Sequence, residues 1–267
     1  MSELPRSARL AAWGNAVLAG AAGPDDLRTA VTGDDEPHRI RRAGSAPARN
    51  GPAHLTELLT ELRAGGLARF RVVLPAPGDG LGLPGPADFN RAALGAGEGV
   101  VAEFRPGLRS RGLLPEITRF GSVWEPGAEV TWVVYEVDDR PDPSGSLAEA
   151  ERALREVTVE TGDVFAGLDR PVHAVEAASV AARLRAGGTP AGSPLPPGSL
   201  PRSVRVLDEA TRIRLVVAAA ERHGGQTLDG FAAARGADAL RRLDSAARRA
   251  IAAAVNAAAA LPDPAGG

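Results

Sequence analysis

A glycine- and proline-rich loop is the segment of this sequence whose residue types best suit a binding site. Residues 80–85 read Gly-Leu-Gly-Leu-Pro-Gly, which matches G-x-G-x-x-G, and they lie between a strand-like and a helix-like stretch. In dinucleotide-binding folds such a loop surrounds a pyrophosphate with backbone N–H groups and a helix N-terminus, and an acidic residue follows about 20 residues later, as Glu103 does here. Gly80, Gly82 and Gly85 are therefore candidate binding residues.

Two prolines and the length of the loop argue against a nucleotide. Pro84 and Pro86 have no N–H to donate to a phosphate. The loop is also longer than the tight turn of the fingerprint, and no alternating series of strands and helices follows it. A rigid turn packed against a sheet is the simpler interpretation. A wider hypothesis keeps Asp79 as a ligand or partner contact, because it lies among glycines at the carboxyl end of a strand.

The segment 34–38 groups three carboxylates with an imidazole. Asp34, Asp35, Glu36 and His38 include oxygen and nitrogen donors that suit a divalent ion. Adjacent side chains point in different directions, however, and no second cluster lies at ligand spacing. A solvated acidic turn is favoured, and no metal site is predicted. His38 is retained as a binding candidate that could reach the same pocket as Asp79.

The remaining residue types complete no catalytic constellation. The chain has no cysteine, which excludes disulfides, thiolate metal sites and a thiol nucleophile. No G-x-S-x-G turn anchors a serine nucleophile. The other histidines fit structural or surface roles near helix ends: His54, His173 and His223. Catalytic residues and cofactors stay unknown at this point, and the sequence leaves open whether the protein is an enzyme.

The basic residues of the chain are all arginines, and they number 31. Their use with abundant alanine, glycine and proline indicates a GC-rich genome. The formal net charge is −2, so no general basic field attracts phosphate. The pairs 241–242 and 248–249 could form a basic stripe for nucleic acid, but no aromatic residues are interleaved with them to stack on bases. A solvated helix face is favoured, and nucleic acid is not expected as a partner.

The elements that would hold these residues form an α+β pattern. Residues 130–137 (VTWVVYEV) are the clearest strand, and their two apolar faces place them centrally in a sheet. Further strands are predicted at 69–74, 99–104 and 114–120, and helices at 5–21, 24–32, 52–64 and 87–97. Short links between the strands favour a small antiparallel or mixed sheet. Residues 34–51 are expected to form a solvated loop.

The second half of the chain shows only helical patterns. Ser146 and Glu149 form a capping box that opens a helix toward Gly167. Further helices are predicted at 171–187, 203–223 and 237–260, with a proline-rich connector at 191–201. The last helix carries a narrow apolar stripe that includes Leu243, Ile251 and Val255. Two domains are predicted, an α+β domain at 1–140 and a helical domain or subdomain at 146–262.

Location follows from what the chain lacks. The N-terminal residues have no basic start followed by an unbroken apolar run, so they do not resemble a signal peptide. No run of about 18 apolar residues is present, so no membrane-spanning helix is expected. The prediction is a soluble, cytoplasmic bacterial protein without a membrane partner.

Four stretches carry a resemblance to a known family. They are 8–18 (ARLAAWGNAVL), 33–38 (GDDEPH), 71–85 (RVVLPAPGDGLGLPG) with the following helix to Val101, and 134–138 (VYEVD). Through them the sequence resembles uncharacterised conserved proteins of high-GC Gram-positive bacteria, the actinobacteria, over most of the chain. The resemblance implies no activity, cofactor or catalytic residue.

Three functional hypotheses follow. The first is a non-enzymatic binding or scaffold protein, with a homo-oligomer formed through its helical half. The second is a small-molecule or nucleotide-binding protein, or an enzyme, that uses the Gly/Pro loop 78–86. The third is nucleic-acid binding through the C-terminal arginines. The sequence identifies no small-molecule ligand.

Overall fold

The computed structural model describes residues 4–35, 38–44, 54–80, 82–122, 126–140, 145–166, 195–223 and 230–258. The chain divides into two compact units. The sheet unit comprises Glu3–Pro143, Pro194–Leu200 and Val255–Gly267, and the helical unit comprises Met1–Ser2, Ser144–Ser193 and Pro201–Ala254. None of the helices in the described ranges combines the length and the hydropathy of a membrane-spanning segment.

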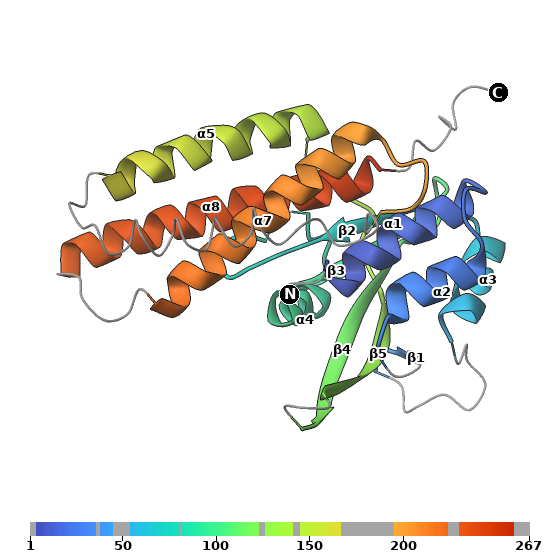
Figure 1. The fold of residues 1–267 in the computed structure, drawn as a ribbon. Coiled ribbons are helices and arrows are strands. Elements are labelled where there is room, and N and C mark those ends of the chain that lie inside the picture. The colour runs from blue at the N-terminus through green and yellow to red at the C-terminus, as the bar shows by residue number, and fades with distance from the viewer. Residues whose placement is uncertain are drawn as a thin grey trace. The chain divides into compact units, whose positions relative to one another are not determined.

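The sheet unit is built on five strands in the order β1-β5-β4-β3-β2 (Figure 1). They are β1 (Arg39–Arg42), β2 (Leu67–Val73), β3 (Gly99–Phe104), β4 (Arg111–Gly121) and β5 (Pro126–Glu136). Strands β2 to β5 pair antiparallel in succession, whereas β1 pairs parallel to β5. Short links join β3 to β4 and β4 to β5, and the connection from β2 to β3 contains a helix. The expected small mixed sheet and the α+β class are confirmed, and β5 has a neighbour on each side.

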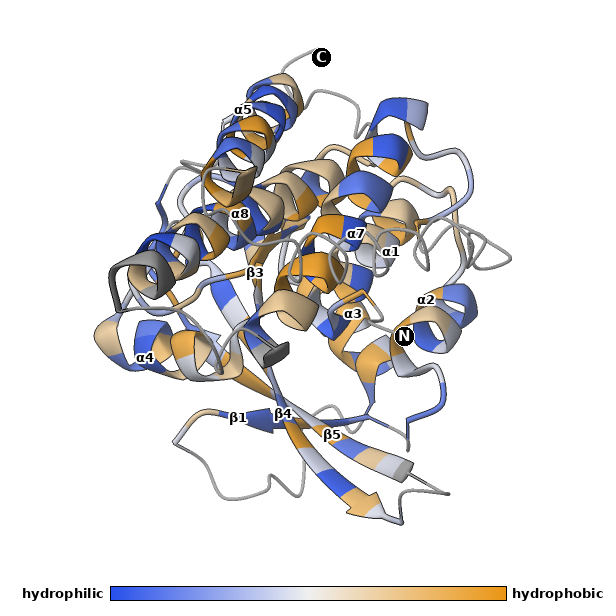
Figure 2. Ribbon diagram, turned by 60° about the vertical axis from the view of Figure 1, so that its left-hand side comes forward, coloured by the Kyte–Doolittle hydropathy of each residue, from blue (hydrophilic) through white to orange (hydrophobic). Residues whose placement is uncertain are grey.

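Strand β1 corrects the expectation that residues 34–51 form only a solvated loop. Arg39–Arg42 pair with residues 131–134 of β5. The sequence Arg-Ile-Arg-Arg is largely hydrophilic, as the blue of β1 in Figure 2 shows, and no residue in it is fully buried. Charged side chains are common on edge strands, and backbone pairing with β5 forms this one. Because β5 lies about 90 residues further along the chain, the local sequence pattern at 39–42 does not predict the strand.

Three helices precede β2 in the chain. They are α1 (Arg6–Leu18), α2 (Pro24–Thr32) and α3 (Leu55–Ala64); α1 contacts β2 and α2, and α2 contacts α3. Asn15 of α1 makes two hydrogen bonds with the backbone of Phe70: its amide donates to the carbonyl at 2.8 Å, and its Oδ1 accepts from the N–H at 2.7 Å. Gly14 lies against the Phe70 ring, where a Cβ would come within 2.5 Å of Cδ2.

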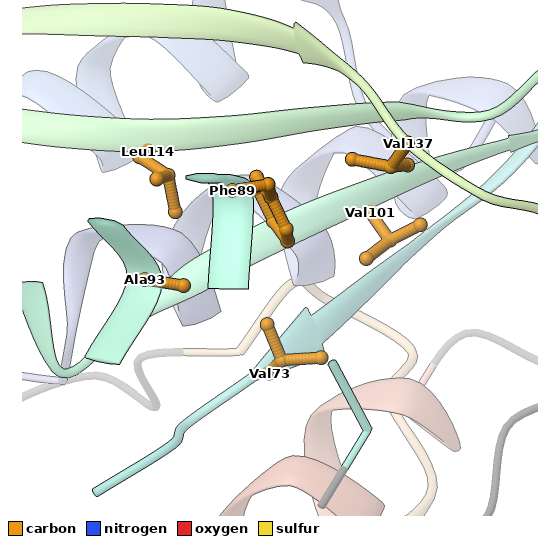
Figure 3. Packing of buried hydrophobic residues seen from close by; sticks show 6 residues of the cluster. All are labelled: Val73, Phe89, Ala93, Val101, Leu114 and Val137. Atoms are coloured by element: carbon orange, nitrogen blue, oxygen red, sulfur yellow. The ribbon is translucent and has the colours of Figure 1, made fainter. Parts of the chain in front are cut away.

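The opposite face of the sheet is covered in part by α4 (Ala87–Ala96). Side chains point to opposite faces along a strand, so Phe70 faces α1 and Val73 faces α4. The buried cluster on the α4 face is drawn in Figure 3: Val73, Phe89, Ala93, Val101, Leu114 and Val137. The Phe89 ring occupies the place where a Cβ of Gly112 would lie, which accounts for a glycine inside β4.

The helical unit contains α5 (Leu147–Ala166), α7 (Pro201–His223) and most of α8 (Gly230–Asn256). The last two residues of α8 belong to the sheet unit. The predicted capping box is confirmed: Ser146 N–H donates to Glu149 Oε2 at 2.7 Å, and Glu149 N–H donates to Ser146 Oγ at 3.2 Å. Helix α8 begins seven residues before its predicted start at 237. The helix predicted at 171–187 and His173 lie outside the described residues.

Candidate functional site

Asp79 lies in a tight turn. Ala76 and Asp79 exchange two backbone hydrogen bonds, of 2.9 and 2.8 Å, around Pro77 and Gly78. Gly78 has a φ of 82°, which fits the third position of a type II turn that has proline before it. The Gly/Pro pattern at this point therefore forms a rigid turn, and Asp79 is half-buried within it.

The rest of the loop is held by a buried arginine. Arg71 of β2 is 1% exposed; its Nη1 donates to the carbonyl of Gly82 at 3.0 Å, and its Nε donates to Glu103 at 2.6 Å. Glu103 also accepts from Arg69, so the acidic residue that the nucleotide hypothesis assigned to a ligand lies between two arginines. This network explains how a full charge is tolerated inside the unit.

The glycines of the loop do not form a free anion cradle. Gly85 N–H donates to Oδ1 of Asn90 at 2.9 Å, so an internal acceptor already uses one N–H that a phosphate would need. Gly85 has a φ of 93°, and a Cβ there would lie 2.6 Å from Asp138 Oδ2. The glycine is therefore explained by backbone conformation and close packing. Gly80 is exposed, and Gly82 is buried beside Arg71.

His38 lies in a separate buried cluster. The indole Nε1–H of Trp132 donates to His38 Nδ1 at 3.0 Å, so the ring proton is on Nε2, which faces Asp35 Oδ2 at 3.2 Å. Arg6 donates two hydrogen bonds of 2.6 Å to the Asp35 carboxylate. The cluster joins the start of α1, the segment after α2 and the middle of β5.

Burial and the bound arginine set the charge states of this cluster. Burial lowers the pKa of His38, and the neighbouring Asp35 opposes this only in part, so the imidazole is neutral at pH 7. Burial alone would raise the pKa of Asp35, but the hydrogen bonds from Arg6 and His38 outweigh it and lower the pKa. The cluster is a neutral histidine beside a paired carboxylate. The hydrogen bonds named above all join residues of the sheet unit, which suits a structural role.

The predicted site residues do not come together. His38 immediately precedes β1 at one edge of the sheet, and the Asp79 turn follows β2 at the other edge. A single pocket that uses both residues is therefore not formed by this arrangement. Among the described residues, no group of three histidine, aspartate or glutamate side chains is placed to hold a metal ion.

The C-terminal arginines make ion pairs within the helical unit. Arg241 contacts Asp238 at 3.0 Å and Arg242 contacts Glu160 of α5 at 2.6 Å. Arg248 contacts Asp244 at 2.8 Å and is buried, and Arg249 likewise interacts within the chain. Arg248 is buried, whereas the side chains of Arg241 and Arg242 are exposed but each lies against a carboxylate. This arrangement favours the structural interpretation of these residues over a nucleic-acid site.

A pocket of about 320 Å³ lies between α4 and the strands β4 and β5. Its size is at the lower end for small-ligand sites. Seven residues line it: Ala92, Ala96, Leu114, Pro115, Glu116, Ile117 and Tyr135. Most of these side chains are apolar, and the two polar groups are the Tyr135 hydroxyl and the Glu116 carboxylate. This pocket is the candidate functional site of the sheet unit.

Tyr135 is held in place and kept protonated. Its ring packs against Phe89 edge-to-face, with the ring centroids 5.6 Å apart. Burial raises the pKa of Tyr135, and the negative charge of Glu116 raises it further. Glu116 is itself bound by Arg41 of β1, whose Nη2 donates to both carboxylate oxygens at 2.7 and 2.8 Å. At neutral pH the phenol is therefore a hydrogen-bond donor, not a base.

Sequence reasoning did not find this pocket. In the sequence, Tyr135 is one aromatic residue of a predicted strand, and Ala92 and Ala96 are not distinctive. The available signal was the spacing of Ala92 and Ala96, which lie one helical turn apart on one side of the predicted helix. Small residues on a helix that packs on a sheet leave room between the two layers, but their partners on β4 and β5 follow only from the sheet register.

The comparisons with known proteins assign the family. Residues 7–147 match the N-terminal domain of the Rv1486c-like proteins, and residues 148–252 match the C-terminal domain of the same proteins. The chain belongs to this family, and the resemblance to uncharacterised actinobacterial proteins is confirmed.

Two relatives illustrate its extent. The chain is 29% identical to the uncharacterised protein Rv1486c of Mycobacterium tuberculosis, over 94% of this chain and 96% of the relative. It is 28% identical to the uncharacterised protein MAV321 of Mycobacterium avium, over 79% of this chain and 78% of that protein. No solved structure matches the chain. The names of these relatives state no activity.

Proposed function

We propose that this protein is a non-enzymatic binding protein and that the sheet unit binds an apolar group in the pocket between α4 and β4. The observation that carries the proposal is the lining of that pocket: a mostly apolar surface around one protonated phenol. Shape and a single directional hydrogen bond are sufficient for recognition, whereas proton transfer at neutral pH requires a group that titrates near that pH.

The chemistry of the lining defines the ligand class. Ala92, Ala96 and Leu114 would contact an aromatic or branched aliphatic group, and the Tyr135 hydroxyl would donate to an acceptor on it. The Glu116 carboxylate is neutralised by Arg41. A ligand with an anionic group therefore gains nothing from this rim, and an uncharged ligand with a carbonyl or amide oxygen fits it best.

Small probes test this proposal on the full chain. We expect benzamide at millimolar concentration to shift the methyl NMR signals of Leu114 and Ile117. Replacing Tyr135 with Phe removes the donor and should weaken benzamide binding by about 2- to 10-fold, the worth of one hydrogen bond. Binding of toluene, which has no acceptor, should be unchanged by that substitution.

A matched pair of variants on α4 completes the test. Ala92→Leu fills the pocket from its wall and should abolish both probe responses, whereas Ala87→Leu, at an exposed position of the same helix, should preserve them. Methyl shifts of equal size in the two variants would contradict the proposal. A cytoplasmic location of the protein is also proposed, and cell fractionation tests it.

A further inference from the structure

Among the described residues, one edge of β4 has no neighbouring strand from residue 114 to residue 121. Strand β3 pairs only with residues 111–113 of β4, whereas β5 pairs with the whole strand from Arg111 to Gly121. Within the described residues, no other backbone hydrogen bond reaches residues 114–121. Residues 118–121 are exposed, and this part of the hairpin projects beyond the rest of the sheet (Figure 1).

Pro115 determines which residues direct their backbone groups to the open edge. Proline has no N–H, so its nitrogen must face away from the ladder with β5. Backbone groups alternate along a strand, so Ile117 and Arg119 also direct their N–H and C=O groups outward. The free edge of β2 differs, because Asn15 binds the backbone of Phe70 and Asn256 accepts from Val72 N–H at 2.9 Å. That edge is closed by side chains, and the β4 edge is not.

We propose that a second copy of this chain pairs antiparallel with this edge, β4 to β4, around a two-fold axis at Thr118. Ile117 of one copy then lies opposite Arg119 of the other, and each such pair exchanges two hydrogen bonds, about four in total. Both copies present the same outward groups, so the contact is self-complementary and closes as a dimer. The net charge of −2 sets up little repulsion between copies.

The apolar residues beside the edge match in the same register. Phe120 is 49% exposed, with its ring over Gly127 of β5, and it lies on the face of the sheet that carries the pocket. In the proposed pair it is opposite Glu116 of the second copy, one of the residues that line the pocket. The exposed half of the ring would therefore cover the pocket mouth. This step rests on the proposed function, in that the pocket takes an apolar group.

The predicted C-terminal stripe does not offer a second route to an oligomer. Leu243, Ile251 and Val255 are each at most 7% exposed in the single chain. The inference therefore moves the subunit contact from the helical half, where the sequence suggested it, to the projecting hairpin.

Sedimentation of the full chain over a concentration series tests the pairing. We expect a monomer–dimer equilibrium that Phe120→Ala weakens at least about tenfold, as loss of most of a buried aromatic contact implies. Leu108→Ala is the matched control: Leu108 is 46% exposed and lies outside β4, so its removal should leave the dimer unchanged. Ile117→Pro, whose nitrogen faces away from β5, should abolish the dimer while retaining the circular dichroism spectrum.

The outcomes separate this inference from the pocket proposal. If the wild-type chain is still a monomer at a concentration of about 100 μM, which is about 100 times a micromolar Kd, the dimer proposal is overturned. The benzamide result is independent of that outcome. A dimer that resists both Phe120→Ala and Ile117→Pro also overturns it, because the contact then lies elsewhere. If both variants lose the dimer and the wild type binds neither benzamide nor toluene, strand pairing is supported. In that case only the pocket proposal is refuted.

Discussion

The indole nitrogen of Trp132 donates its hydrogen bond to Nδ1 of His38 at 3.0 Å, in the interior of the sheet unit. Trp132 and His38 are 0% and 3% exposed. The bond fixes the tautomer of the imidazole and directs its N–H to Asp35, which Arg6 holds from the other side. His38 was a ligand-binding candidate in the sequence, whereas in the structure it links Trp132 to Asp35 inside the sheet unit.

Removal of the imidazole should be strongly destabilising. In His38→Ala the Trp132 N–H loses its acceptor inside the unit and a cavity remains, so we expect a loss of about 2–4 kcal/mol in the free energy of unfolding. Urea unfolding measures it. His54→Ala is the control: His54 is exposed at the N-cap of α3 and its side chain makes no capping bond, so a change below about 0.5 kcal/mol is expected. Equal losses in both variants would show that the cluster is not stabilising.

The same histidine predicts a dependence of stability on pH. Its pKa in the folded protein lies below the ordinary 6.5 because burial disfavours the charged form. Below pH 6.5 the unfolded chain therefore binds the proton more readily than the folded protein does. As the pH is lowered from 6.5 to the folded pKa of His38, the free energy of unfolding decreases by at most about 1.4 kcal/mol per pH unit.

The difference in unfolding free energy between the wild type and the His38→Gln variant isolates the contribution of the imidazole. Glu98 has the opposite sign, since burial raises its pKa and its contribution weakens as pH rises above 4.5. His38→Gln keeps a neutral polar side chain without the titration. Unfolding in urea at pH 7.5, 6.5 and 5.5 should show the wild type losing stability relative to His38→Gln as pH falls. A constant difference across these values would mean that the imidazole titrates normally.

Two arginines that share one carboxylate should differ in importance. Arg71 and Arg69 both bind Glu103, but their side chains are 1% and 45% exposed. Arg71→Ala leaves the Gly82 carbonyl without its donor and a cavity under the loop, so we expect a loss of about 3–5 kcal/mol. Arg69→Ala removes a half-exposed ion pair worth about 0–1 kcal/mol. Thermal unfolding of the two variants ranks them, and a larger effect at Arg69 would disprove the role of Arg71 in holding the loop.

Two loop glycines with left-handed backbones separate conformational strain from crowding. Gly78 has open space around it, whereas a Cβ at Gly85 would lie 2.6 Å from Asp138 Oδ2. Gly78→Ala should lose about 1–2 kcal/mol from its φ alone, and Gly85→Ala should lose more. In the double variant Gly85→Ala with Asp138→Ala, part of the extra loss should return. Urea titration of all three provides the comparison, and the expectation fails if Gly78→Ala is the less stable single variant.

The predicted division at 140–146 becomes a proposal about independent folding. Asn256, at the end of α8, accepts from Val72 N–H of β2 and is part of the sheet unit. Asn256→Ala should speed amide exchange in β2 and leave α5 unaffected if the two units unfold separately. Hydrogen exchange with mass spectrometry reads both segments at once. Faster exchange in both would show one cooperative domain.

The sequence by itself determined the elements that have a strong local signal. Short runs of apolar and β-branched residues specify β3 and β5, Pro24 with two acids after it opens α2, and Ser146 with Glu149 opens α5. Each of these signals lies within one turn or one strand, where side-chain period and capping act. The Gly/Pro loop was also recognised as a rigid turn, because the conformations of proline and glycine are local properties.

Only the tertiary structure decided the surroundings of the chemical residues. Arg71, His38 and Tyr135 resemble any other charged or aromatic residue in the sequence, yet the first is buried under a loop, the second accepts from an indole, and the third lines a pocket. Strand β1 has no apolar pattern and exists because β5 offers an edge. Burial, pairing and pKa all depend on partners that are distant in the chain, and local periodicity does not specify those partners.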